Sequence, residues 1–224
     1  MWKQDIVYLK QHLTSFERLL TEEKKRINEE VPEFPLDKYS DEQQHEISAD
    51  FALDEISVDQ DLAPFHYQAI FLIIYAWFEH WIKINFFVKE NKDKGYLSKF
   101  KYWIKRNKKD SFFKKLKITL KSKNKGNILR SDDWSMIQTI AKIRNLISHN
   151  GTLLELNSKG RKELEKFVDE NPDKIEFTGA VYDFGKEGER YPREIKVNKF
   201  FCKYVLLTLE SFLSKIYTLS ESEK

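Results

Sequence analysis

The segment that most restricts the fold runs from Pro64 to about Glu90 and is apolar on nearly every side of a helix. Pro64 suits the first turn of a helix, because its fixed φ is already helical and its missing N–H is not needed there. Ala69 to Phe78 is strongly apolar, but Glu79 and Lys83 interrupt the run well before the ~20 residues that a membrane-spanning helix needs. The segment is therefore predicted to be a central helix of a globular core, and no membrane is expected as a partner.

The whole chain predicts an all-α protein with one small β-hairpin inserted before the last helix. Its 224 residues include 32 Phe, Tyr and Trp but only 12 Gly and Pro, which suits packed helices and argues against disorder. Further helices are predicted over residues 95–123, 131–149, 158–170 and 198–219. Alternating apolar residues in 174–197, with turn residues Gly185 and Gly188, predict the hairpin.

The N-terminal part of the chain predicts a helix with an apolar seam. Its apolar residues alternate at spacings of four and three: Trp2, Ile6, Leu9, Leu13, Phe16 and Leu20. Such a seam needs a partner helix, from the same chain or from a second subunit. Pro32 and Pro35 end this helix, and an acidic, weakly patterned stretch follows. We expect an N-terminal helical extension with an acidic loop, residues 1–62, and a helical bundle, residues 63–224.

The candidate chemistry lies on the helix predicted from Ser131 to His149. At about 100° per residue, Arg144 falls inside the apolar stripe of this helix, so a permanent cation there needs an anionic partner. His149 lies about 140° around the helix from Arg144 and about 7.5 Å farther along it. The two side chains converge only if the helix ends there, and Asn150-Gly151 supplies residues that favour such an end.

The residues alone leave two interpretations of this pair open. In the structural one, Arg144 pairs with a carboxylate from another helix, with Glu79 as the leading candidate, and His149 interacts with the helix dipole. In the other, the pair is catalytic. No other pattern competes, because the five His are scattered, no phosphate-binding glycine loop is present, and Cys202 has no His near it in sequence. Cys202 is assigned to packing, and neither a metal nor a cofactor is expected.

Arg144-Asn145-Leu146-Ile147-Ser148-His149 resembles the R-x(4-6)-H motif of the HEPN superfamily, in which a polar residue, often Asn, commonly follows the arginine. Tyr75 to Trp81 is similar to the early core helix of that family, which often carries an acidic residue in an aromatic setting, here Glu79. The resemblance covers about residues 63–217 and implies an antiparallel helical bundle. In the antitoxin-regulated branch a modifiable tyrosine follows two residues after the histidine. Gly151 stands there, so control by nucleotidylation at that position is not expected.

The resemblance implies a metal-independent endoribonuclease that acts as a homodimer. His149 would transfer protons at the ribose 2′-hydroxyl or the leaving oxygen, Arg144 would stabilise the scissile phosphate, and Asn145 would position the phosphate or the histidine, with Glu79 in support. The products would be 2′,3′-cyclic phosphate and 5′-hydroxyl ends. By analogy the role would be that of a toxin or an antiviral abortive-infection effector, with an antitoxin or another regulatory protein as a candidate partner. The alternatives are a non-catalytic helical module that binds RNA or protein, and a structural partner built on the N-terminal seam.

Charge is strongly segregated along the chain. Residues 1–61 hold 16 Asp and Glu against 7 Lys and Arg, whereas residues 89–130 hold 3 against 16. The basic block predicts contact with a polyanion, here RNA, through Lys105, Arg106, Lys108, Lys109, Lys114 and Lys115. Its aromatic residues, among them Phe112 and Phe113, either stack on bases or pack in the core, and their helical spacing favours the core. The block could also dock on the acidic N-terminal segment. A single cysteine and the lack of a visible signal peptide predict a cytoplasmic protein.

Overall fold

The computed structural model describes residues 2–30, 40–46, 49, 57–58, 62–88, 112–150, 153–154, 161–178 and 193–221, and this part of the chain is mostly helical. The helices are α1 (Trp2–Glu30), α3 (Ala63–Ile82) with its π-helical continuation η3 (Lys83–Val88), α5 (Phe112–Ser122), the 3-10 helix η5 (Gly126–Arg130), α6 (Asp132–Asn150), α7 (Arg161–Asp169) and α8 (Lys199–Glu221). The strands are β1 (Leu153–Leu154), β2 (Ile175–Thr178) and β3 (Arg193–Val197). Among the described helices, none combines the length and apolar character needed to cross a bilayer.

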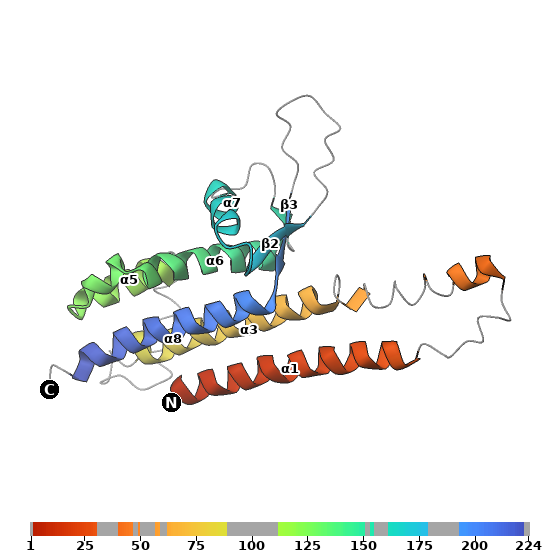
Figure 1. Ribbon diagram of the computed structural model, residues 1–224. Coiled ribbons are helices and arrows are strands. Elements are labelled where there is room, and N and C mark those ends of the chain that lie inside the picture. Colours follow the sequence, from red (N-terminus) through yellow and green to blue (C-terminus); the bar gives the residue numbers. More distant parts are fainter. Residues whose placement is uncertain are drawn as a thin grey trace, which may run out of the picture.

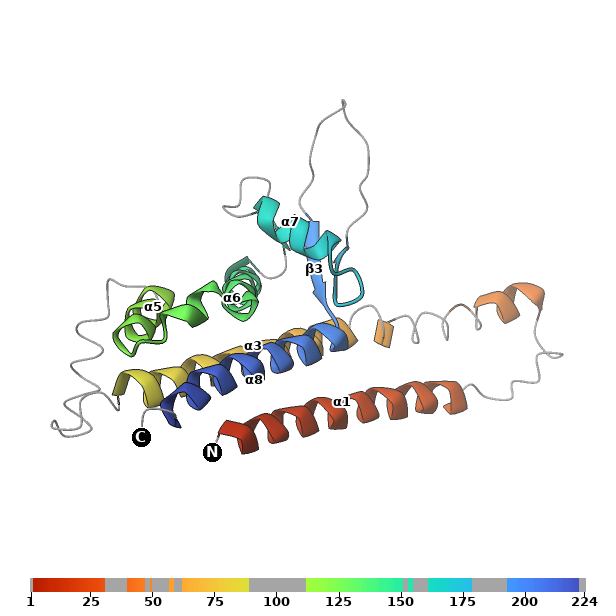
Figure 2. The same cartoon turned by 60° about the vertical axis from the view of Figure 1, so that its left-hand side comes forward.

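The long helices lie in layers (Figures 1 and 2). α1 forms one outer layer, α3 and α8 lie side by side in the middle, and α5 and α6 lie on the opposite side. α3 and α8 run parallel, because Cys202 Sγ lies 3.4 Å from the Tyr67 carbonyl near their starts and the rings of Trp81 and Tyr217 lie 5.3 Å apart near their ends. In Figure 2 α6 is seen nearly end-on, so it crosses these two helices obliquely.

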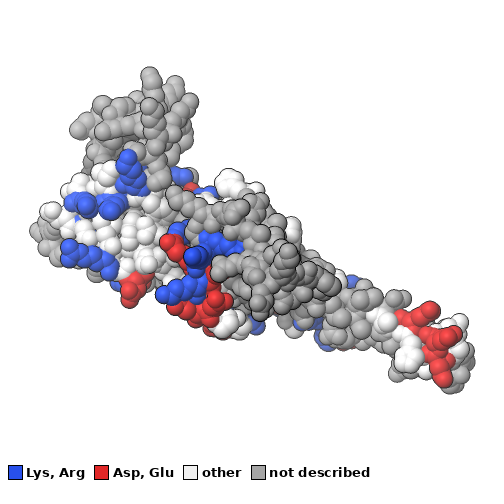
Figure 3. All heavy atoms as spheres, turned by 90° about the horizontal axis from the view of Figure 1, so that it is seen from above, with Lys and Arg blue, Asp and Glu red and all other residues white. Residues whose placement is uncertain are grey.

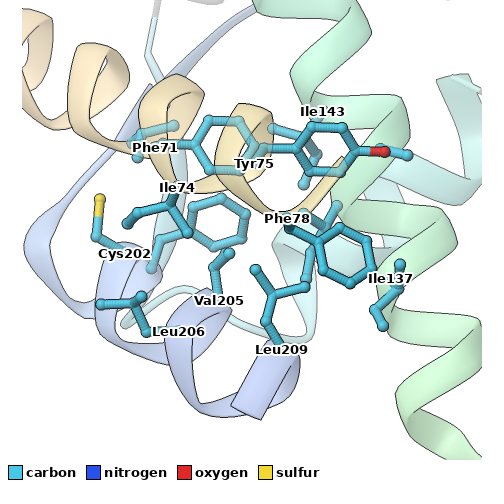
Figure 4. Close-up of a cluster of buried hydrophobic side chains, with 14 of the residues drawn as sticks. Phe71, Ile74, Tyr75, Phe78, Ile137, Ile143, Cys202, Val205, Leu206 and Leu209 are labelled. Carbon is cyan, nitrogen blue, oxygen red and sulfur yellow. The ribbon is translucent and has the colours of Figure 1, made fainter. Parts of the chain in front are cut away.

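Three helices supply the centre of the core (Figure 4). α3 contributes Phe71, Ile74, Tyr75 and Phe78, α6 contributes Ile137 and Ile143, and α8 contributes Cys202, Val205, Leu206 and Leu209, all buried. The assignment of Cys202 to packing is confirmed, since its side chain is fully buried and burial raises the pKa of its thiol. The apolar segment that the sequence placed at the centre of the fold therefore occupies that position as α3.

Polar side chains cap the N-termini of α6 and α8. The backbone N–H of Trp134 donates to Ser131 Oγ at 3.3 Å, which confirms Ser131 as the N-cap of α6. Asn198 caps α8, because its Oδ1 accepts hydrogen bonds of 3.0 Å from the N–H groups of Phe200 and Phe201. The Ser131 cap sets where α6 begins and, with it, the position of Arg144, which follows the buried Ile143.

α1 buries its predicted seam against its own chain. Ile6 and Leu13 are almost completely buried, and Phe16 packs on Tyr67 of α3 with ring centroids 5.4 Å apart. Polar contacts reinforce the packing: Lys10 pairs with Glu210 at 2.7 Å and Lys203 with Glu17 at 2.7 Å. The partner of the seam is thus the α3–α8 layer. The division of the chain at residue 62 stays a prediction.

A small antiparallel sheet stands at the end of α6, with strand order β1-β3-β2. Ile175 of β2 pairs with Val197 of β3, and Leu153 of β1 pairs with Glu194 on the other side of β3. The sequence predicted a hairpin in this region but not β1, which is too short to have a pattern of its own. The predicted alternation from Val181 to Phe184 lies outside the described residues, so the hairpin itself stays a prediction.

Candidate functional site

Arg144 is held by an ion pair across the contact between α6 and α3. Its Nη2 donates a hydrogen bond of 2.7 Å to Glu79 Oε1, and Lys83 Nζ donates one of 3.2 Å to Oε2 of the same carboxylate. The side chains of Arg144 and Glu79 keep 25% and 16% of their exposure, so both are partly screened from water. We call these three groups the charged row. In it, one carboxylate faces the cations of both Arg144 and Lys83.

The ring of Tyr75 packs against the guanidinium of Arg144. The Arg144 Cζ lies 4.8 Å from the centroid of this ring, which is the geometry of a cation–π contact. Tyr75 is only 1% exposed, and in Figure 4 its side chain lies between the α3 core residues and α6. Burial raises the pKa of the Tyr75 phenol, and the negative charge of Glu79 raises it further against the opposing effect of Arg144. The phenol is therefore a neutral platform and not an acid that titrates near neutral pH.

A hollow of about 460 Å³ opens beside the charged row, between α3, α6 and the start of α5. It is lined by Tyr75, Glu79, Phe112, Phe113, Gln138, Ala141, Lys142, Arg144 and Asn145. Four of these residues, Gln138, Ala141, Lys142 and Asn145, recur at spacings of three and four and so share one face of α6. Ala141 leaves room because it has the smallest side chain among them. The volume lies within the ~300 to 1,000 Å³ typical of small-molecule sites.

The chemistry of the hollow favours an anion with an aromatic or polar part. A guanidinium has five N–H donors, and the contact with Glu79 uses the Nη2 side of the fork. The permanent charge of Arg144 adds an electrostatic attraction that partial burial strengthens. Lys142, at the far edge, pairs with Glu163 of α7 and adds no net charge.

The structure separates His149 from this hollow. α6 ends at Asn150, within one residue of the predicted end, and His149 has helical backbone, so it does not share a helix face with Arg144. His149 is exposed, about 140° around the helix from Arg144 and about 7.5 Å farther along it. It does not line the hollow. Asn145, in contrast, lies beside Arg144 at the edge of the hollow. The arrangement therefore assembles Arg144, Asn145 and Glu79 but leaves the histidine on the surface beside them.

The predicted RNA-binding lysines are only partly within the described residues. Lys105, Arg106, Lys108 and Lys109 lie outside them, whereas Lys114 is exposed and Lys115 half-buried on α5. From Phe112 to Ser131 the chain has seven Lys and Arg and no carboxylate. Figure 3 shows basic side chains over the end of the molecule that holds α5 and α6, with acidic side chains among them, and a further acidic group at the far end, formed by residues 41–46. The basic side chains of α5 thus lie on the same side of the core as the hollow.

Two lining residues were not singled out from the sequence. Gln138 and Ala141 carry no motif, and their role depends on where α5 sits against α6. Their spacing to Asn145 was the one available signal, because residues i, i+3 and i+7 share a helix face. Phe113, assigned to the core by its spacing, is half-buried and lines the hollow.

No group of three or more His, Cys, Asp or Glu side chains that could hold a metal ion occurs in the part of the chain that the structure describes. No family model, curated protein or solved structure matches the chain. The candidate site is therefore interpreted from its own geometry and from the motif in the sequence.

Proposed function

We propose that the protein is a metal-independent endoribonuclease of the HEPN type that acts as a homodimer. Cleavage would proceed by attack of the ribose 2′-hydroxyl and leave 2′,3′-cyclic phosphate and 5′-hydroxyl ends. The observation that supports this most is the charged row at the edge of the hollow. A permanent cation is fixed there by a carboxylate and an aromatic ring, and its guanidinium retains N–H donors for a phosphate.

Each member of the site has a role in this proposal. Arg144 binds the scissile phosphate and stabilises the charge that grows on its oxygens in the transition state. Glu79 and Tyr75 position Arg144, so that little reorganisation is needed when the phosphate arrives. Asn145 donates to a phosphate oxygen from the next position on α6. His149, exposed at the end of the same helix, acts as the acid or base, a task that suits an imidazole near neutral pH.

The ion pair also supports a HEPN-like helical bundle. In the family, an acidic residue of an early core helix accompanies the motif, and here Glu79 of α3 bonds directly to Arg144 of α6. The structural interpretation of Arg144 predicts the same contact. The cleavage measurements described below distinguish the two interpretations.

An exposed apolar strip on α3 supports the homodimer. Phe65 is 67% exposed and Ile73 50%, and the half-buried Leu72 lies on the same side of α3 as Phe65, two turns along the helix. A helix that is apolar all round is normally covered on every side. Glu79 borders this strip at the end of α3 that faces Arg144. We propose that a second copy covers the strip and brings its own His149 to the shared cleft, because each chain offers one such histidine and the cleavage needs both an acid and a base.

Purified protein incubated with total RNA tests the activity. The wild type should cut RNA, and His149→Ala should lose the cutting while melting at the same temperature, since the side chain is exposed. His12→Ala is the matched control, because His12 is an exposed histidine on α1, in another layer. A His149→Ala protein that cuts RNA at the wild-type rate would show that the catalytic assignment is wrong.

A second pair of variants tests the dimer. Ile73→Glu should yield a monomer by light scattering and lose cleavage, whereas Leu207→Glu, on α8 and 58% exposed against 50% for Ile73, should change neither. A dimer that survives Ile73→Glu would contradict the assignment of the strip.

The second candidate function is a non-catalytic module that binds RNA or a protein. The observation that favours it is the exclusion of His149 from the hollow, together with the bond that Arg144 makes to Glu79. This function predicts RNA binding without cleavage under every condition. Under the first proposal, the biological role would be that of a cytoplasmic toxin or antiviral defence effector, with an antitoxin or another regulatory protein as a partner. Growth arrest on expression, relieved by His149→Ala, would support that role.

A further inference from the structure

Gln138 presents a polar group to the hollow that the cleavage mechanism does not use. Its side chain is exposed on α6, lines the hollow, and makes no hydrogen bond within the part of the chain that the structure describes. A carboxamide offers both donors and an acceptor. An exposed helical glutamine is usually a solvated surface group. This one differs because it lies over a cavity whose other end holds a phosphate-binding arginine.

The wall next to Gln138 is aromatic and rigid. Phe113 is half-buried and meets two rings edge-on, Phe112 at 5.3 Å and Trp134 at 5.6 Å between centroids. Trp134 lies one turn before Gln138 on α6, so Phe113 stands at the Gln138 end of the hollow and not at the Arg144 end. Two edge contacts fix the orientation of the ring, which is what a stacking surface requires.

The two polar ends of the hollow lie at different levels along α6. Gln138 and Arg144 are six residues apart on α6, a rise of about 9 Å. One nucleotide spans a similar length from its phosphate to the outer edge of its base. The cationic end therefore suits the phosphate and the aromatic end the base, with the small side chain of Ala141 between them.

We propose that this hollow binds one unstacked nucleobase of single-stranded RNA, with Phe113 beneath the base and Gln138 hydrogen-bonded to its edge. The inference rests on the proposed ribonuclease function and adds a substrate class and a specificity residue to it. Duplex RNA is excluded, because its bases are stacked and their edges lie in grooves that side chains read poorly. Stacking on an aromatic ring with hydrogen bonds to a base edge is the usual chemistry of sequence-specific recognition of single strands.

Binding is measured on the full-length His149→Ala protein, so that no RNA is cut during the measurement. The probes are a fluorescent single-stranded RNA hexamer, the same hexamer with one abasic position at each site in turn, and its duplex. We expect the single strand to bind best and one abasic position to weaken binding by about 5- to 150-fold. We also expect affinity to vary among the four bases at that position.

Adding Gln138→Ala should remove this preference among bases while leaving the fold and most of the affinity intact. Gln11→Ala, another exposed helical glutamine but on α1, is the matched control and should keep the preference. Phe113→Leu should reproduce the loss seen with the abasic probe. If RNA binds but every abasic probe and Gln138→Ala behave like the reference, the base-binding site is wrong and the ribonuclease proposal stands. If no RNA binds the protein at all, the proposed function itself is wrong.

Discussion

The pairing of Arg144 with Glu79 predicts a measurable coupling energy, which a double-mutant cycle of Arg144→Met and Glu79→Gln isolates. Exposed ion pairs are worth about 0.2 to 1 kcal/mol, while breaking a buried pair costs about 3 to 5 kcal/mol. The side chains here keep 25% and 16% exposure, so the pair lies between these limits, and Lys83 still faces Glu79 when Arg144 is removed. We expect a coupling of about 1 to 2 kcal/mol.

Arg144→Met also loses the cation–π contact with Tyr75, so its total cost should reach about 2 to 3 kcal/mol. In urea unfolding followed by tryptophan fluorescence, a loss of 2 kcal/mol shifts the midpoint by about 0.7 to 1 M at a slope of about 2 to 3 kcal/mol/M. If the two single substitutions add to within about 0.5 kcal/mol of the double variant, the pair does not act as described.

The Arg144→Lys variant distinguishes a structural role of Arg144 from a catalytic one. A lysine keeps a cation for Glu79, so the protein should lose no more than about 1 kcal/mol, but it lacks the planar fork that binds a phosphate through two N–H groups. RNA cleavage should fall by about 100-fold or more, as with other losses of a transition-state donor. A stable Arg144→Lys protein that cuts at the wild-type rate would show that Arg144 is chiefly structural.

Three further outcomes are expected. Leu13→Ala should cost about 2 to 5 kcal/mol in urea unfolding and Leu19→Ala almost nothing, because the first leucine is 1% exposed and the second 56% on the same helix; equal effects would mean that α1 does not pack as described. RNA cleavage should persist in excess EDTA, and an activity that returns only with added Mg²⁺ would contradict the 2′-hydroxyl mechanism. Burial raises the pKa of Cys202 above its unfolded value, so the folded chain holds this proton more tightly and stability falls as the pH rises above about 8.5. Cys202→Ala should reduce that slope between about pH 8.5 and 9.5, and an unchanged slope would assign it to other groups.

Periodicity and capping made most helix positions predictable from the sequence. Ser131 was predicted as a cap and is one, and the apolar segment predicted as a helix from Pro64 to about Glu90 forms α3 and its π-helical continuation η3, from Ala63 to Val88. Glu79 was predictable as the partner of Arg144, because a cation inside an apolar stripe needs a carboxylate from a neighbouring helix. These features depend on local preferences and on one strong electrostatic requirement.

The remaining parts depend on tertiary placement, which no local pattern encodes. The hollow exists because the start of α5 stands beside α6, and a single sequence does not specify how two helices cross. β1 has two residues, too few for an alternation, and forms only because β3 offers a free edge. The end of α6 at Asn150 was predictable to within one residue, but where the side chain of His149 lies relative to Arg144 depends on how the chain turns there and on any second subunit.

The packing of α1 on α8 has a consequence for how the chain is made. Lys10 and Glu210, which pair across these helices, are 200 residues apart. At about 5 to 20 residues per second, a ribosome adds α8 roughly 10 to 40 s after α1. During that time α8 is not yet present to cover the apolar face of α1. The charged residues on the opposite face of α1 are the part of this helix that water solvates well. The docking of the last helix, and not the formation of the first, is thus the step that completes this layer, and contacts of such long range are the slow ones in folding.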